Sequence, residues 1–203
     1  MRRLPQILGV LATLAWAVAI GVGVERIWRY ESTPGAAEAS PPKWPASTLV
    51  ARRPGQSTLV MFVHPRCPCS RASLTELREI MTQAGGNLTA AVLFLRPQGV
   101  DDAWERTATF REAQGISGVT VRVDRDGAEA ARFGAVTSGY TLLYDAGGGL
   151  LYAGGITAAR GHVGDNAGRR SVLALLRAHP TDRHEHPVYG CPLHDPKSSQ
   201  GGA

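Results

Sequence analysis

Two cysteines separated by one residue are the side chains in this sequence best suited to chemistry. Cys67 and Cys69 lie in the segment FVHPRCPCSRASL, residues 62–74, where an apolar strand is expected to end and a helix to begin. Unpaired N–H groups and the dipole at a helix N-terminus lower the pKa of a thiol, and Arg66 and His64 add positive potential there. Because a thiolate is the nucleophile in disulfide exchange, the segment predicts a reactive sulfur at Cys67.

The sequence does not decide which cysteine forms a disulfide with Cys67. A disulfide from Cys67 to Cys69 would close a small, strained ring that is easily reduced. Alternatively, Cys67 forms mixed disulfides that Cys69 or the distant Cys191 resolves. Cys191 lies in PVYGCPL, residues 187–193, an apolar patch within a polar tail. If this patch docks beside Cys67, Cys191 becomes a resolving cysteine or a third metal ligand; otherwise it is a free or structural thiol.

Metal binding is a second chemistry that the residue types allow. Thiolates and imidazoles bind zinc, and soft thiolates suit Cu(I), so copper or zinc is a candidate, although thiol exchange requires no cofactor. The candidate ligands are Cys67, Cys69, Cys191, His64, His162, His184 and His186. Their spacing matches no zinc finger, and a solvated polar tail is the alternative interpretation of the late histidines.

Other functions are excluded or disfavoured by the sequence. The chain has no phosphate-binding glycine loop, no G-x-S-x-G elbow and no calcium loop. The formal net charge is +5, but much of this excess comes from arginines within the first 53 residues. No stripe of basic residues interleaved with aromatics follows, so nucleic acid is not an expected partner.

Hydrophobic patterning predicts an α/β domain. Apolar strands are expected over residues 57–64, 88–95, 119–124, 140–145 and 150–156, with helices over 70–84, 101–114, 127–133 and 166–178. Alternation of strands and helices implies parallel pairs, and the glycine run at 147–149 joins the last two strands as an antiparallel hairpin. The result is a mixed sheet flanked by helices.

A different kind of segment precedes this domain. Ile7 to Val24 is an uncharged apolar run of membrane-spanning length, flanked by arginines. We interpret residues 1–29 as a transmembrane signal anchor, with a cleaved signal peptide as the alternative. Residues 30–55 are rich in proline and are predicted to form a semi-extended linker. The domain is expected over residues 56–180, followed by a tail, 181–203, that carries histidines and Cys191.

The segment around Cys67 resembles the active-site turn of the thioredoxin superfamily, and the resemblance covers residues 57–178. Phe62 stands five residues before Cys67, as an aromatic commonly does before the first active cysteine of that family. Two positions depart from the family pattern. Ser70 takes the place of the second cysteine, so the pattern is C-P-C-S. Gly139 or Tyr140 takes the place of the cis-proline that faces the cysteines, a loss that tends to accompany metal or cluster binding.

The pattern as a whole, with TSGYTLLYD, GGITAARGHVGDN and YGCPL, is also similar to a group of bacterial membrane-tethered thioredoxin-like proteins labelled RedB. The resemblance implies a thiol–disulfide oxidoreductase of exported proteins, single-pass in the bacterial inner membrane with its domain in the periplasm. Cys67, Cys69 and Cys191 would be catalytic, supported by His64, Arg66, Ser70, Gly139 and Tyr140. A metal-binding module and a redox-sensing accessory protein are the alternatives.

Overall fold

The computed structural model describes residues 3–179, 181 and 183–194, and it separates the chain into two compact units, 1–33 and the remainder from Pro34 on. The first unit is a single helix, α1 (Arg3–Ser32), in which no residue is buried. Its length and mean hydropathy are sufficient to cross a membrane. The predicted apolar span is therefore helical and extends slightly past its expected end.

The second unit contains a mixed sheet of six strands within the described residues. The strand order is β3-β2-β1-β4-β5-β6. Strands β1, β2 and β3 run parallel, whereas β4 is antiparallel to both β1 and β5. The bounds are β1 (Ser57–Val63), β2 (Leu88–Arg96), β3 (Val119–Arg125), β4 (Tyr140–Tyr144), β5 (Leu150–Gly154) and β6 (Glu185–His186). The central position of β1 places its C-terminal end in the middle of one sheet edge.

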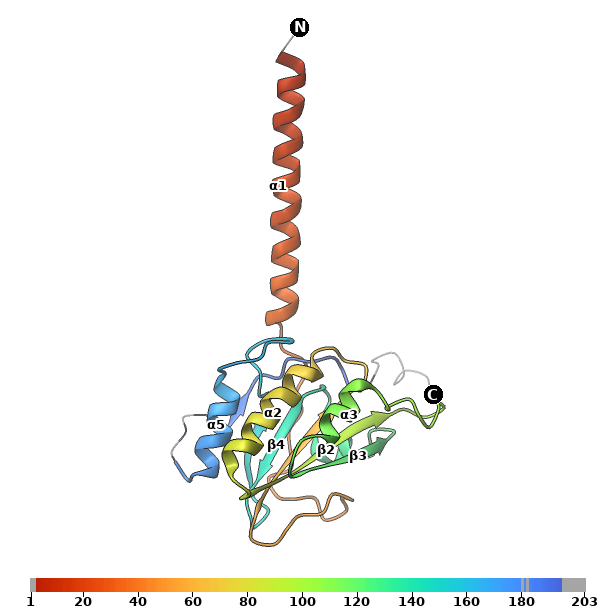
Figure 1. The fold of residues 1–203 in the computed structure, drawn as a ribbon, viewed down its shortest axis with the longest axis vertical. Coiled ribbons are helices and arrows are strands. Elements are labelled where there is room, and N and C mark those ends of the chain that lie inside the picture. Colours follow the sequence, from red (N-terminus) through yellow and green to blue (C-terminus); the bar gives the residue numbers. More distant parts are fainter. Residues whose placement is uncertain (1–2, 180, 182, 195–203) are drawn as a thin grey trace. The chain divides into compact units, whose positions relative to one another are not determined.

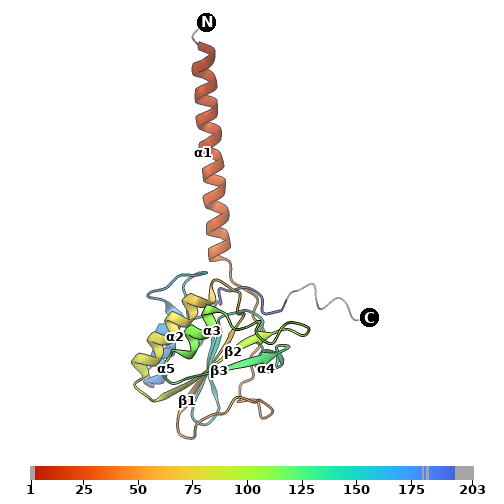
Figure 2. The ribbon, with the colours of Figure 1, turned by 45° about the vertical axis from the view of Figure 1, so that its right-hand side comes forward.

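Helices cover both faces of this sheet (Figures 1 and 2). α2 (Ser70–Ala84) lies between α3 (Ala108–Gln114) and α5 (Ala167–Leu176) on one face and contacts both of them. The short α4 (Ala128–Phe133) packs beside β3 on the opposite face. The sheet is thus buried on both sides, which explains why β1 is an almost continuous apolar run.

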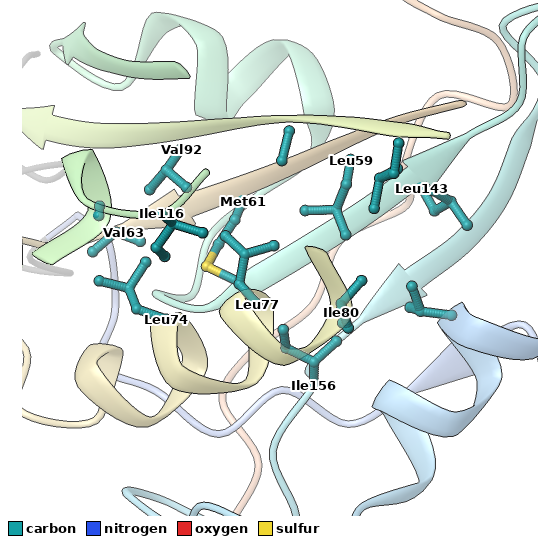
Figure 3. Close-up of a cluster of buried hydrophobic side chains, with 14 of the residues drawn as sticks. Leu59, Met61, Val63, Leu74, Leu77, Ile80, Val92, Ile116, Leu143 and Ile156 are labelled. Carbon is teal, nitrogen blue, oxygen red and sulfur yellow. The ribbon is translucent and has the colours of Figure 1, made fainter. Parts of the chain in front are cut away.

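The larger core cluster fixes α2 against β1 (Figure 3). Leu74, Leu77 and Ile80 project from α2 and are completely buried. They meet alternate residues of β1, of which Met61 lies centrally. This packing is close to native core density and leaves little freedom for the start of α2 relative to the end of β1. The turn that joins these two elements carries the cysteine pair.

The predicted order of strands and helices is confirmed, but the helix expected over 101–114 begins only at Ala108. The guanidinium of Arg96 is bound by Asp102 and by the buried Glu105, which holds the preceding residues in turns. Thr107 then caps α3, because its side-chain oxygen accepts a hydrogen bond from the N–H of Phe110 at 3.3 Å. A local ion-pair cluster therefore overrides the helical pattern of this segment.

The segment predicted to be a semi-extended linker packs along the second unit from Pro34 to Val50. Trp44 makes edge-to-face contacts with Phe133 and Tyr144, at ring-centroid distances of 5.4 and 5.1 Å. Val50 is 4% exposed, and the N–H of Trp44 donates to a carbonyl of the β4–β5 turn. Buried aromatic area outweighs the extended preference of the flanking prolines. This part of the chain belongs to the domain.

The tail also folds onto the domain as far as it is described, and residues 195–203 lie outside the described part. Strand β6 extends the sheet by pairing in parallel with β5. Val188 and Leu193 are 2% and 3% exposed and join the second core cluster. The sequence left open whether the apolar patch 187–193 docks, and in the structure it packs on the domain.

Candidate functional site

The cysteine pair sits in a tight turn between β1 and α2. The N–H of Cys67 donates to the carbonyl of His64 at 3.0 Å, and the N–H of Ser70 donates to the carbonyl of Cys67 at 3.2 Å. Cys69 occupies the N-cap position of α2, and its side chain makes no capping hydrogen bond. Cys67 and Cys69 are only 3% and 5% exposed. The turn therefore holds both sulfurs beneath a cover rather than at an open surface.

A serine that the sequence patterns did not single out faces this turn from the segment just before β4. The Oγ of Ser138 accepts a hydrogen bond from the N–H of His64 at 2.8 Å and lies 2.9 Å from the Oγ of Ser70. Ser70, which stands at the second-cysteine position of the C-P-C-S pattern, thus links the first turn of α2 to the opposite loop. Sequence alone gave no signal for Ser138, because its role depends on the pairing of β1 with β4.

The docked tail crosses directly over Cys67. The N–H of Ser138 donates to the carbonyl of Cys191 at 2.8 Å, and the N–H of Leu193 donates to the carbonyl of Val136 at 2.9 Å. These two bonds flank an antiparallel bridge between Thr137 and Pro192. They place the N–H of Cys191 at 3.4 Å from the Sγ of Cys67. Two cysteines that are 124 residues apart in the chain therefore meet.

Hydrogen bonds to the Cys67 sulfur lower the pKa of this thiol to about 4. The largest cause is a side-chain hydrogen bond from Cys191; burial opposes it, and further donors are the N–H of Cys191, the hydroxyl of Ser70 and the N–H of Cys69. The same interaction raises the pKa of Cys191. The proton shared by the pair therefore resides on Cys191, and Cys67 is a thiolate at neutral pH.

Cys69 differs from Cys67 in its electrostatic environment. Burial raises the pKa of the Cys69 thiol, and the neighbouring Cys67 thiolate raises it further, whereas Arg160 lowers it. Arg160 also donates a hydrogen bond to the carbonyl of Gly190 in the tail. This arginine comes from the loop between β5 and α5, so it connects that loop to both the cysteine turn and the tail. Arg160 lies in the polar loop GGITAARGHVGDN, and the composition of this loop does not indicate which residues Arg160 contacts.

His64 and Arg66 border the site on one side. The His64 ring is in edge-to-face contact with Trp104 at 5.4 Å, and the Arg66 guanidinium lies 4.8 Å from the centre of the same indole. Burial lowers the pKa of His64, while the Cys67 thiolate opposes this shift. The Nδ1 of His64 accepts from the N–H of Arg66 at 3.2 Å. Trp104 is thus a further residue beside the site, brought there by the Arg96 cluster.

The two residues at the cis-proline position have separate environments. Gly139 has a φ of +88° and donates its N–H to the carbonyl of Phe62 at 2.7 Å. A side chain there would press on Ser73 of α2, so the left-handed backbone and the close packing both favour glycine. Tyr140 is buried in the second core cluster, and its hydroxyl lies 3.0 Å from the Oγ of Ser40. Only Gly139 therefore borders the cysteine turn.

The histidines proposed as metal ligands lie on separate elements. His184 bonds the carbonyl of Leu151, His186 lies 2.9 Å from the Oγ of Ser171, and His162 is exposed. In the part of the chain that the structure describes, no three His, Cys, Asp or Glu side chains are grouped to hold a metal ion. The fold thus brings Cys191 to Cys67, in the turn that also carries Cys69, without the histidines of the tail.

Comparisons with known proteins extend these observations. No protein-family model and no curated relative matches the sequence. A hypothetical protein from Sinorhizobium meliloti is 23% identical with a TM-score of 0.57, covering 79% of this chain and 93% of its own. An uncharacterized conserved protein from Geobacillus kaustophilus is 17% identical with a TM-score of 0.57, covering 81% and 94%. A secreted disulfide oxidoreductase from Mycobacterium tuberculosis is 17% identical with a TM-score of 0.43, covering 62% and 83%.

The fold is thioredoxin-like. The first two likenesses extend over most of both chains, and the strand order, with a β1–α2–β2 unit beside the β4–β5 hairpin and α5, agrees with the resemblance in the sequence. Within this thioredoxin-like domain, the cysteine turn follows the central strand. Its chemistry is that of a thiolate with two neighbouring thiols, and the arrangement can exchange disulfides once a partner reaches Cys67.

Proposed function

We propose that the chain is a membrane-anchored thiol–disulfide oxidoreductase in which Cys67 is the nucleophile and Cys191 is the resolving cysteine. One observation carries this proposal: the backbone N–H of Cys191 lies 3.4 Å from the Sγ of Cys67. Hydrogen bonding between the two side chains is also the largest cause that lowers the pKa of Cys67 and raises that of Cys191. A stabilised thiolate beside a second thiol is the arrangement that disulfide exchange requires.

The exchange proceeds in two steps. The Cys67 thiolate attacks one sulfur of a protein disulfide, which forms a mixed disulfide and releases the other sulfur as a thiolate that takes a proton. Cys191, after losing its proton, attacks Cys67 and releases the second target sulfur. The target disulfide gains two electrons and two protons: the Cys67–Cys191 pair supplies both electrons and the one proton of Cys191, and solvent supplies the second proton. In reverse, the same steps oxidise a protein dithiol and return the pair to its reduced form.

The local geometry favours Cys191 over Cys69 as the resolving residue. Cys191 offers Cys67 both its thiol and its backbone N–H, whereas a disulfide from Cys67 to Cys69 would close a small ring. The backbone between Cys67 and Cys69 is also fixed by the turn that starts α2. Cys69 supports the site through its N–H, which is a donor to the Cys67 sulfur.

The partners that fit this chemistry are disulfide- or thiol-bearing exported proteins. Helix α1 is long and apolar enough to anchor the chain in a membrane, and Arg3 near its N-terminus favours a cytoplasmic start. Protein disulfides, the substrates of this exchange, form and persist mainly on the oxidising side of the membrane. We therefore place the domain in the periplasm of a bacterium, on a single-pass inner-membrane anchor. A thiol-blocking reagent that cannot cross the inner membrane should label Cys191 in intact spheroplasts; protection until lysis would contradict this orientation.

The catalytic assignment is tested by trapping. Full-length Cys191→Ser protein in detergent, mixed with insulin as the protein disulfide, should accumulate a Cys67–insulin mixed disulfide visible by mass spectrometry. Cys69→Ser is the matched control, because it removes one sulfur from the same turn and should still complete the exchange. Cys67→Ser should show no adduct at all. Accumulation of the adduct in Cys69→Ser instead would make Cys69 the resolving cysteine, and insulin reduction by Cys67→Ser would remove the proposal.

Copper or zinc binding by the same cysteines is the second candidate function. The hydrogen-bond contacts of the Cys67 sulfur with the side chains of both Cys191 and Cys69 favour it, because soft thiolates bind Cu(I). No ready-made metal-binding group exists among the described side chains, so binding would require the cysteines to rearrange. Reduced protein dialysed against Cu(I) or Zn(II) should retain one ion, lost in Cys67→Ser. No retained metal would exclude this function and leave the exchange reaction unaffected.

A further inference from the structure

Access to the nucleophile is the problem that the exchange reaction leaves unsolved. Cys67 is 3% exposed, and attack on a protein disulfide needs the target sulfur in line with and in contact with its Sγ. The tail passes over this sulfur, with Gly190 buried and Cys191 half-buried. A target cannot reach Cys67 while the tail stays in this position.

The tail is held there by an isolated antiparallel β-bridge. Its backbone bonds to Val136 and Ser138 are antiparallel sheet bonds at 2.9 and 2.8 Å, flanking the bridge of Thr137 to Pro192. An extended peptide that joins an exposed strand edge makes this same set of main-chain bonds. The segment Val136–Ser138 therefore presents an edge of main-chain hydrogen-bonding groups, and the chain's own tail occupies it.

Two buried side chains and one glycine fix this occupant. Val188 and Leu193 anchor it on either side of Cys191 in the second core cluster. Between them, Gly190 lies so close to the carbonyl of Ser138 that a β-carbon at this position would overlap its oxygen. The carbonyl of Gly190 accepts a hydrogen bond from Arg160. The close approach at Gly190 lets Cys191 reach Cys67.

We propose that residues 187–194 are an autoinhibitory internal ligand, which occupies the edge Val136–Ser138 and shields Cys67 until a protein partner displaces it with an extended cysteine-bearing segment of its own. The inference rests on the proposed function and adds its regulation. The partner segment takes the tail's antiparallel position, and a glycine just before its cysteine fits there for the same steric reason as Gly190. Release of the tail also withdraws the Cys191 donors, so opening weakens the stabilisation of the Cys67 thiolate while it grants access.

The experiment separates access from ionisation. In full-length protein in detergent, the rate of Cys67 alkylation by iodoacetamide is followed by mass spectrometry across pH. The plateau at high pH, where Cys67 is fully ionised in every variant, reports access alone, and the midpoint reports the pKa. Gly190→Ala should raise the plateau by about tenfold or more, because the added methyl group expels the tail through a local opening. Its midpoint should move upward from that of the unaltered protein.

Gly115→Ala is the matched control. Gly115 ends α3 with a φ of −81°, and a methyl group there meets its neighbours at ordinary distances of 3.5 Å or more. This variant should leave the plateau unchanged. Hydrogen exchange shows whether Gly190→Ala frees only the tail, by lost protection of the Leu193 amide with β1 still protected. Should β1 also lose protection, Leu193→Ala provides a milder release.

A variant whose tail is released but whose plateau is unchanged overturns the inference. At the high-pH plateau, faster formation of the Cys67–insulin mixed disulfide by the released variant supports it and slower formation contradicts it, because this first step needs neither resolution by Cys191 nor the Cys191 donors. Failure of the proposed function has a different signature. In that case, alkylation of Cys67 still responds to tail release, but no mixed disulfide forms in the Cys191→Ser protein.

Discussion

At the scale of single residues, the site is a thiolate surrounded by donors. The sulfur of Cys67 receives hydrogen bonds from the thiol and N–H of Cys191, from the hydroxyl of Ser70 and from the N–H of Cys69. These groups replace the water that burial removes, and they outweigh the cost of burying a charge. The positive charge of Arg66 is directed to Trp104 and contributes less. The sequence indicated a lowered pKa from the helix N-terminus, whereas the largest single cause of the shift is the distant Cys191.

Removal of the Cys191 thiol should therefore raise the pKa of Cys67. A hydrogen bond to a charged group contributes about 1.5–3 kcal/mol, which corresponds to an upward shift of about 1–2 pH units in Cys191→Ala. Thiolate absorbance at 240 nm, titrated in protein that also carries Cys69→Ser, measures this value directly. Cys191→Ser is the matched control, because its hydroxyl can still donate to the Cys67 sulfur and should retain most of the shift. Equal pKa values in the Ala and unaltered proteins would contradict this account.

At the scale of elements, sequence patterns predicted strands and helices well where burial is continuous. The apolar run of β1 and the helical spacing of apolar residues in α2 both result from burial in the core. The bounds of these two elements are therefore close to those expected. Patterns failed where a few long-range contacts decide the structure. The turns before α3 depend on Arg96, and the packing of the proline-rich segment depends on Trp44.

The same distinction applies to the candidate site. The position of Cys67 and Cys69 between β1 and α2 could be predicted from residue type and patterning, and the apolar patch 187–193 indicated docking of the tail as one of two alternatives. The contact of Cys191 with Cys67, and the roles of Ser138 and Arg160, could not. They arise from the pairing register of segments far apart in the chain, which local composition does not encode. Such contacts become visible only after β4 and the tail have been placed.

Helix α2 depends on a buried ion pair for its position relative to the loop that carries Arg160. Glu76 is fully buried and accepts hydrogen bonds from Arg169 at 2.5 Å, from the N–H of Gly164 at 2.7 Å and from the Nδ2 of Asn166 at 3.2 Å. We expect Glu76→Ala to lower the free energy of unfolding by about 3–5 kcal/mol, because it leaves the Arg169 charge without its partner. Urea denaturation of the full chain in detergent measures the loss.

An apolar replacement of both partners provides the control for this prediction. Glu76→Leu combined with Arg169→Met removes the charges together and should recover most of the lost free energy. Hydrogen exchange at Gly164 should show a loosened loop in Glu76→Ala alone. A loss below about 1 kcal/mol would indicate that the pair is no stronger than a surface salt bridge.

At the scale of the whole molecule, both ends of the folded domain converge on the loop that faces the cysteines. The N–H of Gly35 donates to the carbonyl of Val188 at 2.8 Å, and Thr137 donates its hydroxyl to the carbonyl of Ala36 at 2.7 Å. The first residues after α1 therefore brace the tail where it covers Cys67. The residues that surround Cys67 come from the whole length of the second unit. The cover over Cys67 and the hydrogen bonds to its sulfur therefore form only when the entire unit folds.

Because folding forms the hydrogen bonds to the Cys67 sulfur, the free energy of unfolding depends on pH through the ionisation of Cys67. The pKa of Cys67 falls from its ordinary value of 9.0 to about 4 on folding, so between these values the unfolded chain binds one proton more than the folded chain. Stability contributed by Cys67 is then fully present above the unfolded pKa and is lost as pH falls toward the folded one. One full proton corresponds to a slope of about 1.4 kcal/mol per pH unit, an upper limit for a sulfur that solvent partly screens.

The difference in unfolding free energy between the unaltered protein and Cys67→Ala should therefore grow as pH rises from about 5 to about 8. Urea denaturation of the full chain in detergent, repeated across this range, measures it. Cys69→Ala is the matched control: the pKa of Cys69 is raised on folding, so Cys69 keeps its proton in both states over this range and its removal should cost the same at each pH. A Cys67→Ala difference that stays constant with pH would mean that the folded protein does not hold Cys67 as a thiolate, and the donors around its sulfur would then have no role in its ionisation.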